Sequence, residues 1–358
     1  MYRRRPLDVP FAQPGKSIAL DCHEAILIAR GGEIERSRAV ARAAYHRAQA
    51  GGVESDLLVA LNSIALCQVV SGAYIEAMAT GIDAHRLAVR MSDRRAMLQA
   101  LTTIVTASLF ILETSSILHG TLDRCLAEAK SLGDATLEMQ VRNGRGIMLL
   151  KQQQFEASIA EIALARELIA GADGSMPAAI LAANIAGVRM RKAGAARPEA
   201  RAALQEEAEA AIRAALLEAT RVGNREAISR SHFALAGLFQ QRGQYPPALD
   251  ALNDSCALAD ALRHSYRKTG ILLERGRIYI ATQNYGLALE AFDAAHMEAQ
   301  SRLPCKDLST ASDYLAKVHE SLGNRRAADK ARLRANEESA HFKRECMAAQ
   351  LEVAHLWQ

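Results

Sequence analysis

Aromatic side chains are scarce in this sequence, at 4% of 358 residues, although half of the residues are hydrophobic. A core with so few large rings must be filled by Ala, Leu, Ile and Met side chains, which suits closely packed helices. The chain is also longer than the ~250–300 residues at which a single hydrophobic core stops growing, a limit that stacked repeats escape. The composition therefore indicates an all-α protein, and the length allows either two domains or one solenoid.

Common catalytic signatures are missing as well. The sequence has no Gly-rich phosphate loop, no HExxH motif, no nucleophile elbow and no paired Cys/His ligands. The ten histidines are scattered along the chain. We therefore expect a protein that is not an enzyme and that needs no metal or cofactor. An enzyme built from dispersed residues that converge in the fold is the alternative.

The six cysteines are far apart and form no CxxC pair, which fits neither a disulfide framework nor a zinc site. They are typical of small apolar residues in a reducing compartment and favour a cytoplasmic location. No stretch approaches ~18 uninterrupted apolar residues, so we expect no membrane span. The formal net charge of +4 is too balanced to indicate a nucleic-acid partner.

The first 16 residues are distinct from the rest. Pro6, Pro10 and Pro14 recur at every fourth position, which forbids a regular helix. Three arginines at positions 3–5 lack the apolar segment that would follow them in a signal peptide. We expect residues 1–16 to form a flexible, solubilising arm, and contact of this arm with nucleic acid or an anionic membrane is the less favoured alternative.

Two neighbouring stretches within residues 232–300 share one order of small, aromatic and turn residues. The first copy holds Leu235, Ala236, Phe239, Gly243, Tyr245, Ala248, Leu252 and Ser255, and forty residues later the same slots hold Arg275, Gly276, Tyr279, Gln283, Tyr285, Ala288, Phe292 and Ala295. This order resembles the tetratricopeptide repeat, a helical hairpin with a period of ~34 residues or more. The resemblance implies a scaffold that binds proteins or peptides.

The slot at the hairpin turn recurs through the whole chain. It is occupied by Gly32, Gly72, Leu112, Gln153, Gly194, Gly243, Gln283 and Gly323. Seven residues earlier, where paired helices would cross, stand Ala25, Ala65, Val105, Gly146, Gly187, Ala236, Gly276 and Ala316. We therefore predict a right-handed α-solenoid of about eight hairpins over residues 17–335. The third unit fits worst, so its register stays open.

Two further features interrupt the regular spacing. An insertion from Ala195 to about Ala203 predicts a longer second helix in the fifth unit, at roughly 199–222. The second helix of the last unit begins near Arg325 and meets no glycine or proline before the end of the chain. Residues 336–358 are therefore expected to form the far end of one long C-terminal helix.

Polar residues gather at the slot ten residues before the turn, which faces the groove in tetratricopeptide proteins. Four successive slots of this kind hold Asn62, Thr102, Asn143 and Asn184. In peptide-binding members of the family, asparagines at this slot hold the bound backbone, so the resemblance implies this role for Asn62, Asn143 and Asn184. The alternative is that these amides bond neighbouring helices or solvent.

Basic residues also map to groove-facing slots in the second half of the chain. They are Lys151, Arg191, Lys192, Arg230, Arg277 and Lys317. Because charged clefts attract partners of opposite charge, they predict a groove that favours an acidic peptide. A solvated helix face is an equally good interpretation of the same residues.

The far end of the C-terminal helix carries an apolar seam with spacings of four and three residues. It consists of Phe342, Cys346, Ala349, Val353 and Leu356. Such a seam predicts homodimerisation through a short coiled coil, or a packing surface within the chain. The layout also resembles the sensory half of bacterial tetratricopeptide diguanylate cyclases. That resemblance implies a regulatory input module as a second function, without cyclase activity because no Gly-Gly-Asp-Glu-Phe signature is present.

Overall fold

A computed structural model describes residues 17–30, 34–111, 116–169, 176–262, 265–300 and 305–355. These residues form sixteen helices and no strand. The helices are α1 (Ile18–Arg30), α2 (Ile34–Gly51), α3 (Glu54–Val70), α4 (Tyr74–Met91), α5 (Arg94–Ile111), α6 (Ser116–Leu132), α7 (Ala135–Lys151), α8 (Phe155–Glu167), α9 (Met176–Ala195), α10 (Pro198–Arg221), α11 (Arg225–Gln241), α12 (Tyr245–Ala261), α13 (Ser265–Ala281), α14 (Tyr285–Gln300), α15 (Lys306–Ser321) and α16 (Arg325–His355). The predicted all-α solenoid of helical hairpins is confirmed.

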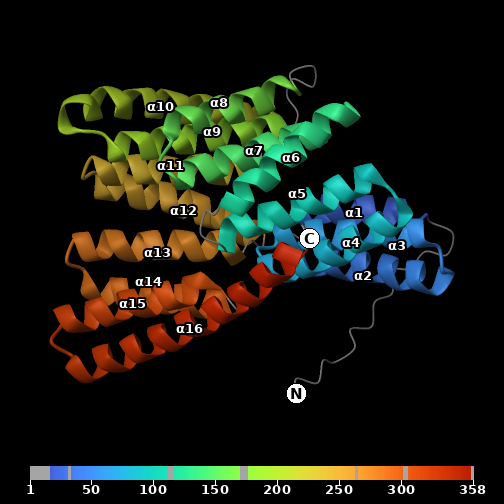
Figure 1. The fold of residues 1–358 in the computed structure, drawn as a ribbon. Coiled ribbons are helices and arrows are strands. Elements are labelled where there is room, and N and C mark those ends of the chain that lie inside the picture. Colours follow the sequence, from blue (N-terminus) through green and yellow to red (C-terminus); the bar gives the residue numbers. More distant parts are fainter. Residues whose placement is uncertain are drawn as a thin grey trace.

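The hairpins follow one another as a solenoid whose end returns to its beginning (Figure 1). Each helix packs against the helix that follows it in the chain, and α1, α3, α5, α9 and α13 also pack against the first helix of the next hairpin. In the view of Figure 1, helices α1–α5 form one group at the right, α6–α12 lie above and to the left of it, and α13–α16 follow at the left and lower left. The long helix α16 crosses back toward the first group and contacts α4. The concave side of the solenoid is therefore partly enclosed by the chain itself.

The predicted hairpin turns are confirmed where the structure describes them, with one exception. Five of the turn residues have a left-handed backbone: Gly72 (φ 77°), Gln153 (φ 59°), Gly243 (φ 71°), Gln283 (φ 59°) and Gly323 (φ 74°). Gly194 instead lies inside α9, one residue before the helix ends. The turns expected at Gly32 and Leu112 lie outside the described residues, as does the arm expected at residues 1–16.

Several hairpins are joined by a left-handed residue followed by a capping residue. Gly133 (φ 64°) ends α6, and the Asp134 carboxylate then accepts a hydrogen bond from the Leu137 backbone N–H at 3.0 Å. The same pair of events occurs at Ser92 with Asp93 and at Gly223 with Asn224. Such a cap stabilises a helix by about 1 kcal/mol. The sequence therefore specifies both the end of one hairpin and the start of the next.

The two helices of a hairpin cross closely at the predicted small residues. In the first unit the Ser37 hydroxyl donates to the Ala25 carbonyl at 2.8 Å, and in the fourth unit Ser158 donates to the Gly146 carbonyl at 2.7 Å. A Cβ added at Gly146 would lie 2.4 Å from the Ile162 side chain. Small residues at these slots thus permit an approach that larger ones would prevent.

The insertion in the fifth unit lengthens both of its helices. Helix α9 has 20 residues and α10 has 24, whereas α12 has 17. The sequence predicted extra length in the second helix of this unit, and α10 confirms it. The extra length of α9, the first helix, was not predicted. Pro198 occupies the first turn of α10, where its missing N–H costs nothing. At the other end of the chain, α16 is the predicted long helix, with 31 residues.

Replacing Gly276 by alanine should overpack the hairpin of α13 and α14. The added Cβ would lie 2.5 Å from the ring of Phe292, which is fully buried and stacked on Tyr314. We expect Gly276→Ala to lower the free energy of unfolding by about 1–3 kcal/mol. The control is Gly270→Ala in the same helix, because that Cβ meets nothing within 4 Å. Urea denaturation that gives both variants equal stability would contradict the predicted close crossing.

Candidate functional site

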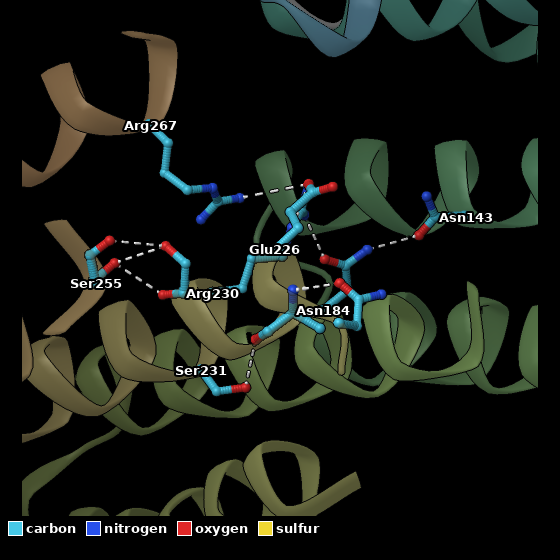
Figure 2. A network of polar contacts seen from close by, with 10 residues as sticks. Asn143, Asn184, Glu226, Arg230, Ser231, Ser255 and Arg267 are labelled. Atoms are coloured by element: carbon cyan, nitrogen blue, oxygen red, sulfur yellow. Dashed lines mark hydrogen bonds and ion pairs between the residues drawn. The ribbon is translucent and has the colours of Figure 1, made fainter. Parts of the chain in front are cut away.

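A chain of polar contacts joins three successive odd-numbered helices on the concave side. The Asn184 side chain on α9 donates through Nδ2 to Asn143 Oδ1 on α7 at 3.0 Å, and Arg230 Nη1 on α11 donates to Asn184 Oδ1 at 2.8 Å (Figure 2). The linked residues are 41 and 46 positions apart in the chain. All three side chains are partly exposed. The repeat therefore brings these predicted groove residues together.

The arginine determines which way the two amides point. A guanidinium only donates hydrogen bonds, so the Asn184 atom that faces Arg230 must be the oxygen. The Asn184 nitrogen then faces Asn143, whose oxygen must accept, and the Asn143 nitrogen is directed away from the chain of contacts. Within the described residues this leaves two N–H donors on Asn143 and one on Asn184 for a ligand.

Glu226 and Arg267 extend the site. Arg230 Nε donates to Glu226 Oε1 at 3.1 Å, one turn away on the same helix. Burial acts to lower the pKa of Arg230, yet the Glu226 carboxylate, as a charge and as a hydrogen-bond acceptor, leaves that pKa raised. Arg267 on α13 approaches the same carboxylate, with Nη2 at 4.0 Å from Oε1 (Figure 2). One carboxylate therefore serves two guanidinium groups.

The other two predicted rungs of the ladder are placed differently. The side chains of Asn62 on α3 and Thr102 on α5 are each only 5% exposed. The Thr102 hydroxyl donates to the Leu98 carbonyl of its own helix at 2.8 Å. Asn62 Oδ1 is buried with no hydrogen-bond partner in the described residues. The structure does not bring them to Asn143 and Asn184, and their role in binding stays a prediction.

The remaining basic residues do not form a continuous strip. Lys192 pairs with Glu156 at 2.6 Å, Arg277 pairs with Glu274 at 2.9 Å, and the Lys317 ammonium lies 5.0 Å from the ring centre of Tyr314. Arg191 is exposed. Burial, and then the positive charge of Lys306, lowers the pKa of Lys151. Of the predicted basic residues, only Arg230 joins the asparagines.

An aromatic cluster closes the solenoid near this site, and we call it the closure contact. It consists of the turn residue Gly72, Tyr74 at the start of α4, Phe110 near the end of α5 and Tyr266 at the start of α13. The Tyr74 and Phe110 rings stack at 4.5 Å between centroids, and the Tyr266 ring meets Tyr74 edge-on at 5.5 Å. The closure contact therefore joins the first hairpins to the seventh.

The C-terminal helix takes part in the same region. Phe342 and Cys346 are 9% and 8% exposed within this single chain. The Cys346 thiol donates to the Ile111 carbonyl at the end of α5, with 3.6 Å between sulfur and oxygen. The side chains of Ala349 and Val353, and all of Leu356, lie outside the described residues. Two of the five predicted seam residues are thus engaged inside the chain, and dimerisation stays a prediction.

A cavity of about 190 Å³ lies beside the closure contact. It is lined by the α3–α4 turn, the end of α5, and residues of α13, α15 and α16. Pockets for drug-sized ligands occupy roughly 300–1,000 Å³. The cavity is therefore too small for such a ligand, and the chain of polar side chains remains the better candidate site.

Among the described residues, no group of three or more His, Cys, Asp or Glu side chains is arranged to hold a metal ion. None of the helices in that part of the chain combines the length and apolar character needed to cross a membrane. None of the six cysteines, all of which lie in the described ranges, forms a disulfide.

Comparison by sequence finds no matching protein family and no matching curated protein. The fold does match solved structures. A Rap protein complexed with competence and sporulation factor aligns with 92% of this chain and 99% of its own, at a TM-score of 0.58 and 14% identity. The Rap conjugation gene regulator of the plasmid pLS20, in complex with the Phr* peptide, aligns with 91% and 95%, at a TM-score of 0.58 and 13% identity.

A third match is a signal transduction ATPase with a tetratricopeptide repeat sensor from Pyrococcus horikoshii. It aligns with 95% of this chain and 50% of its own, at a TM-score of 0.50 and 15% identity. The fold is a tetratricopeptide-type solenoid. The structural alignments establish this fold. Because the sequence identities are so low, they do not identify a ligand.

Sequence reasoning missed Glu226, Arg267 and the closure contact. Glu226 could have been found, because a glutamate four residues before an arginine forms a favourable pair on a helix. Arg267 gave no such signal, since it meets Glu226 only when α13 packs beside α11. The same holds for Tyr74 and Tyr266, which are brought together by the return of the solenoid.

Replacing Gly72 by alanine should loosen the closure contact. Its added Cβ would lie 2.8 Å from Tyr266 Cβ, and its left-handed backbone would cost about 1–2 kcal/mol in addition. The matched control is Gly243→Ala, which has the same backbone cost but no neighbour within 4 Å. We expect small-angle X-ray scattering to show a larger radius of gyration for Gly72→Ala only. Equal radii would mean that the first hairpins are not held by this contact.

Proposed function

We propose that this chain is a non-enzymatic scaffold that binds an extended peptide or protein segment along α7, α9, α11 and α13. The observation that carries the proposal is the chain of contacts from Asn143 through Asn184 to Arg230. It fixes amide donors at successive hairpins while leaving some of them unused. An extended backbone presents carbonyl oxygens at regular intervals, and fixed donors bind them without a further loss of side-chain entropy.

The fold of the solved neighbours supports a peptide ligand. One of them is in complex with the Phr* peptide, and it aligns with 95% of its length. The positive charge of the arginines beside Glu226 supports an acidic ligand. Arg230 and Arg267 share a single carboxylate. A partly enclosed surface with excess positive charge attracts acidic segments and disfavours basic ones.

The setting we propose is regulatory and cytoplasmic, as in bacterial signalling proteins with this type of repeat. The absence of a disulfide among the six cysteines supports a reducing compartment. We propose residues 17–335 as the binding unit and 336–358 as the end that passes its state onward. Homodimerisation through that end would require Phe342 and Cys346 to leave their present contacts.

Peptide binding should depend on the two asparagines. Random ten-residue peptides displayed on phage are selected on the wild-type chain, and the best peptide is synthesised for fluorescence anisotropy. Changing both Asn143 and Asn184 to alanine removes several hydrogen bonds of about 0.5–1.5 kcal/mol each, so we expect binding to weaken about ten-fold or more.

The matched control is Asn253→Ala on α12. Asn253 is also an asparagine whose oxygen accepts from an arginine, Arg275, at 2.8 Å, but it is exposed on a second helix. Its loss should change binding less than two-fold. Equal affinity of wild type and double variant would contradict the proposed groove, as would a selection that enriches no peptide above the background without protein.

A regulatory input module is the second candidate, and the packing of α16 favours it. The far end of α16 touches the end of α5 beside the closure contact, and Tyr266 of that contact directly precedes Arg267. A ligand on Arg267 would thus act close to the C-terminal helix. We expect the selected peptide, at saturation, to change the small-angle scattering profile of the wild-type chain. An unchanged profile would leave a binding scaffold without this form of output.

A further inference from the structure

Arg267 carries a charge that the described part of the chain does not neutralise. Its side chain is 15% exposed, and among the described residues the only carboxylate within 4.0 Å is that of Glu226. Glu226 is already committed to Arg230, which donates to it from Nε at 3.1 Å and from a second nitrogen. Arg267 lies too far from Glu226, at 4.0 Å, for a hydrogen bond to its carboxylate. Two guanidinium groups and one carboxylate leave one net positive charge on this enclosed surface.

Such an arrangement is costly unless a ligand completes it. Taking a charged group out of water is compensated only when an opposite charge and hydrogen bonds replace the lost hydration. Burial, followed by the positive charge of Arg230, lowers the pKa of Arg267 to about 10. Arg230, which has the carboxylate as a close partner, shows the opposite direction. Arg230 is hydrogen-bonded to the Glu226 carboxylate, whereas Arg267 only approaches it to 4.0 Å and has to share it.

We propose that Arg267, together with Arg230, binds a carboxylate of the ligand. The inference rests on the proposed peptide-binding function and names the chemistry of one contact within it. A planar guanidinium matches a carboxylate in a two-bonded geometry, and the two arginines approach Glu226 from different helices (Figure 2). A ligand carboxylate beside Glu226 would give each arginine its own acceptor.

The size of the net charge distinguishes a carboxylate from a phosphate. The site offers one uncompensated positive charge, and a carboxylate carries one negative charge. A phosphate monoester carries about −1.5 to −2 near neutral pH, which would leave excess negative charge against Glu226. The carboxylate belongs either to an acidic side chain or to the C-terminus of a peptide. Asn143 and Asn184, which lie beside Arg230, then hold the adjoining backbone.

Nuclear magnetic resonance of the full chain, labelled with ¹⁵N at arginine Nε, tests the contact directly. The probes are N-acetyl-glutamate N′-methylamide for a side-chain carboxylate, N-acetyl-alanine for a terminal carboxylate, and N-acetyl-glutamine N′-methylamide as the uncharged isostere. Inorganic phosphate is a fourth probe. At low ionic strength we expect saturable shifts of the Arg267 and Arg230 signals with at least one carboxylate probe and none with the glutamine probe.

The exposed Arg191 is the internal control for weak, general binding of anions. Shifts of Arg191 as large as those of Arg267 would overturn the proposal. So would tighter binding of phosphate than of either carboxylate. These small probes do not need a peptide backbone. A failed peptide selection with intact carboxylate binding would therefore sink the proposed function alone, and the reverse result would sink this inference alone.

Variants at the two arginines provide a second test. Arg267→Gln should weaken carboxylate binding about ten-fold, so that the shift of Arg230 saturates at about ten-fold higher probe concentration, as expected for the loss of a charge-assisted hydrogen bond. Because it removes a charge without a counter-charge, it should leave the thermal midpoint unchanged or raise it. Arg230→Gln should lower the midpoint, since it leaves Glu226 and Asn184 without their main donor. If both variants lower the midpoint equally, Arg267 is already paired and the proposal is wrong.

Discussion

The rest of the structure depends on the close approach of the two helices within each hairpin. At that approach a serine or alanine of the second helix lies against the backbone of the first, as Ser158 does when it donates to the Gly146 carbonyl. The close distance limits how the two helices of a hairpin can be oriented. Because the same crossing recurs in each hairpin, the first helices of successive hairpins have similar directions. Asn143, Asn184 and Arg230 can touch because α7, α9 and α11 are stacked in this way.

The repeat determines where groove residues lie, but the return of the chain determines which of them are open. Helices α3 and α5 belong to the part that the closure contact joins to α13. Asn62 and Thr102 occupy the same repeat slot as Asn143 and Asn184, yet each is only 5% exposed. The site is therefore confined to the middle of the solenoid, where the polar chain and the excess positive charge coincide.

This difference also explains which features could be predicted from the sequence and which could not. Helix ends were predictable because they depend on local chemistry, such as the left-handed Gly133 followed by the cap at Asp134. The small residues at helix crossings were predictable because they recur with the period. The closure contact depends on Tyr74, Phe110 and Tyr266, which no local rule relates. The same applies to Arg267, because its need to share the Glu226 carboxylate with Arg230 arises only when the helices are assembled.

The closure contact and the proposed carboxylate contact are close in energy as well as in space. An aromatic pair contributes about 0.5–1.5 kcal/mol beyond the burial of its area, and the closure contact has three such pairs. A hydrogen bond to a charged group contributes about 1.5–3 kcal/mol. Because Arg267 follows Tyr266 on the first turns of α13, a ligand that draws this guanidinium toward itself acts on the helix that holds the first hairpins. Occupancy of the groove and closure of the solenoid are linked to the extent that the ligand binds Arg267 with different affinity when the closure contact is formed and when it is broken.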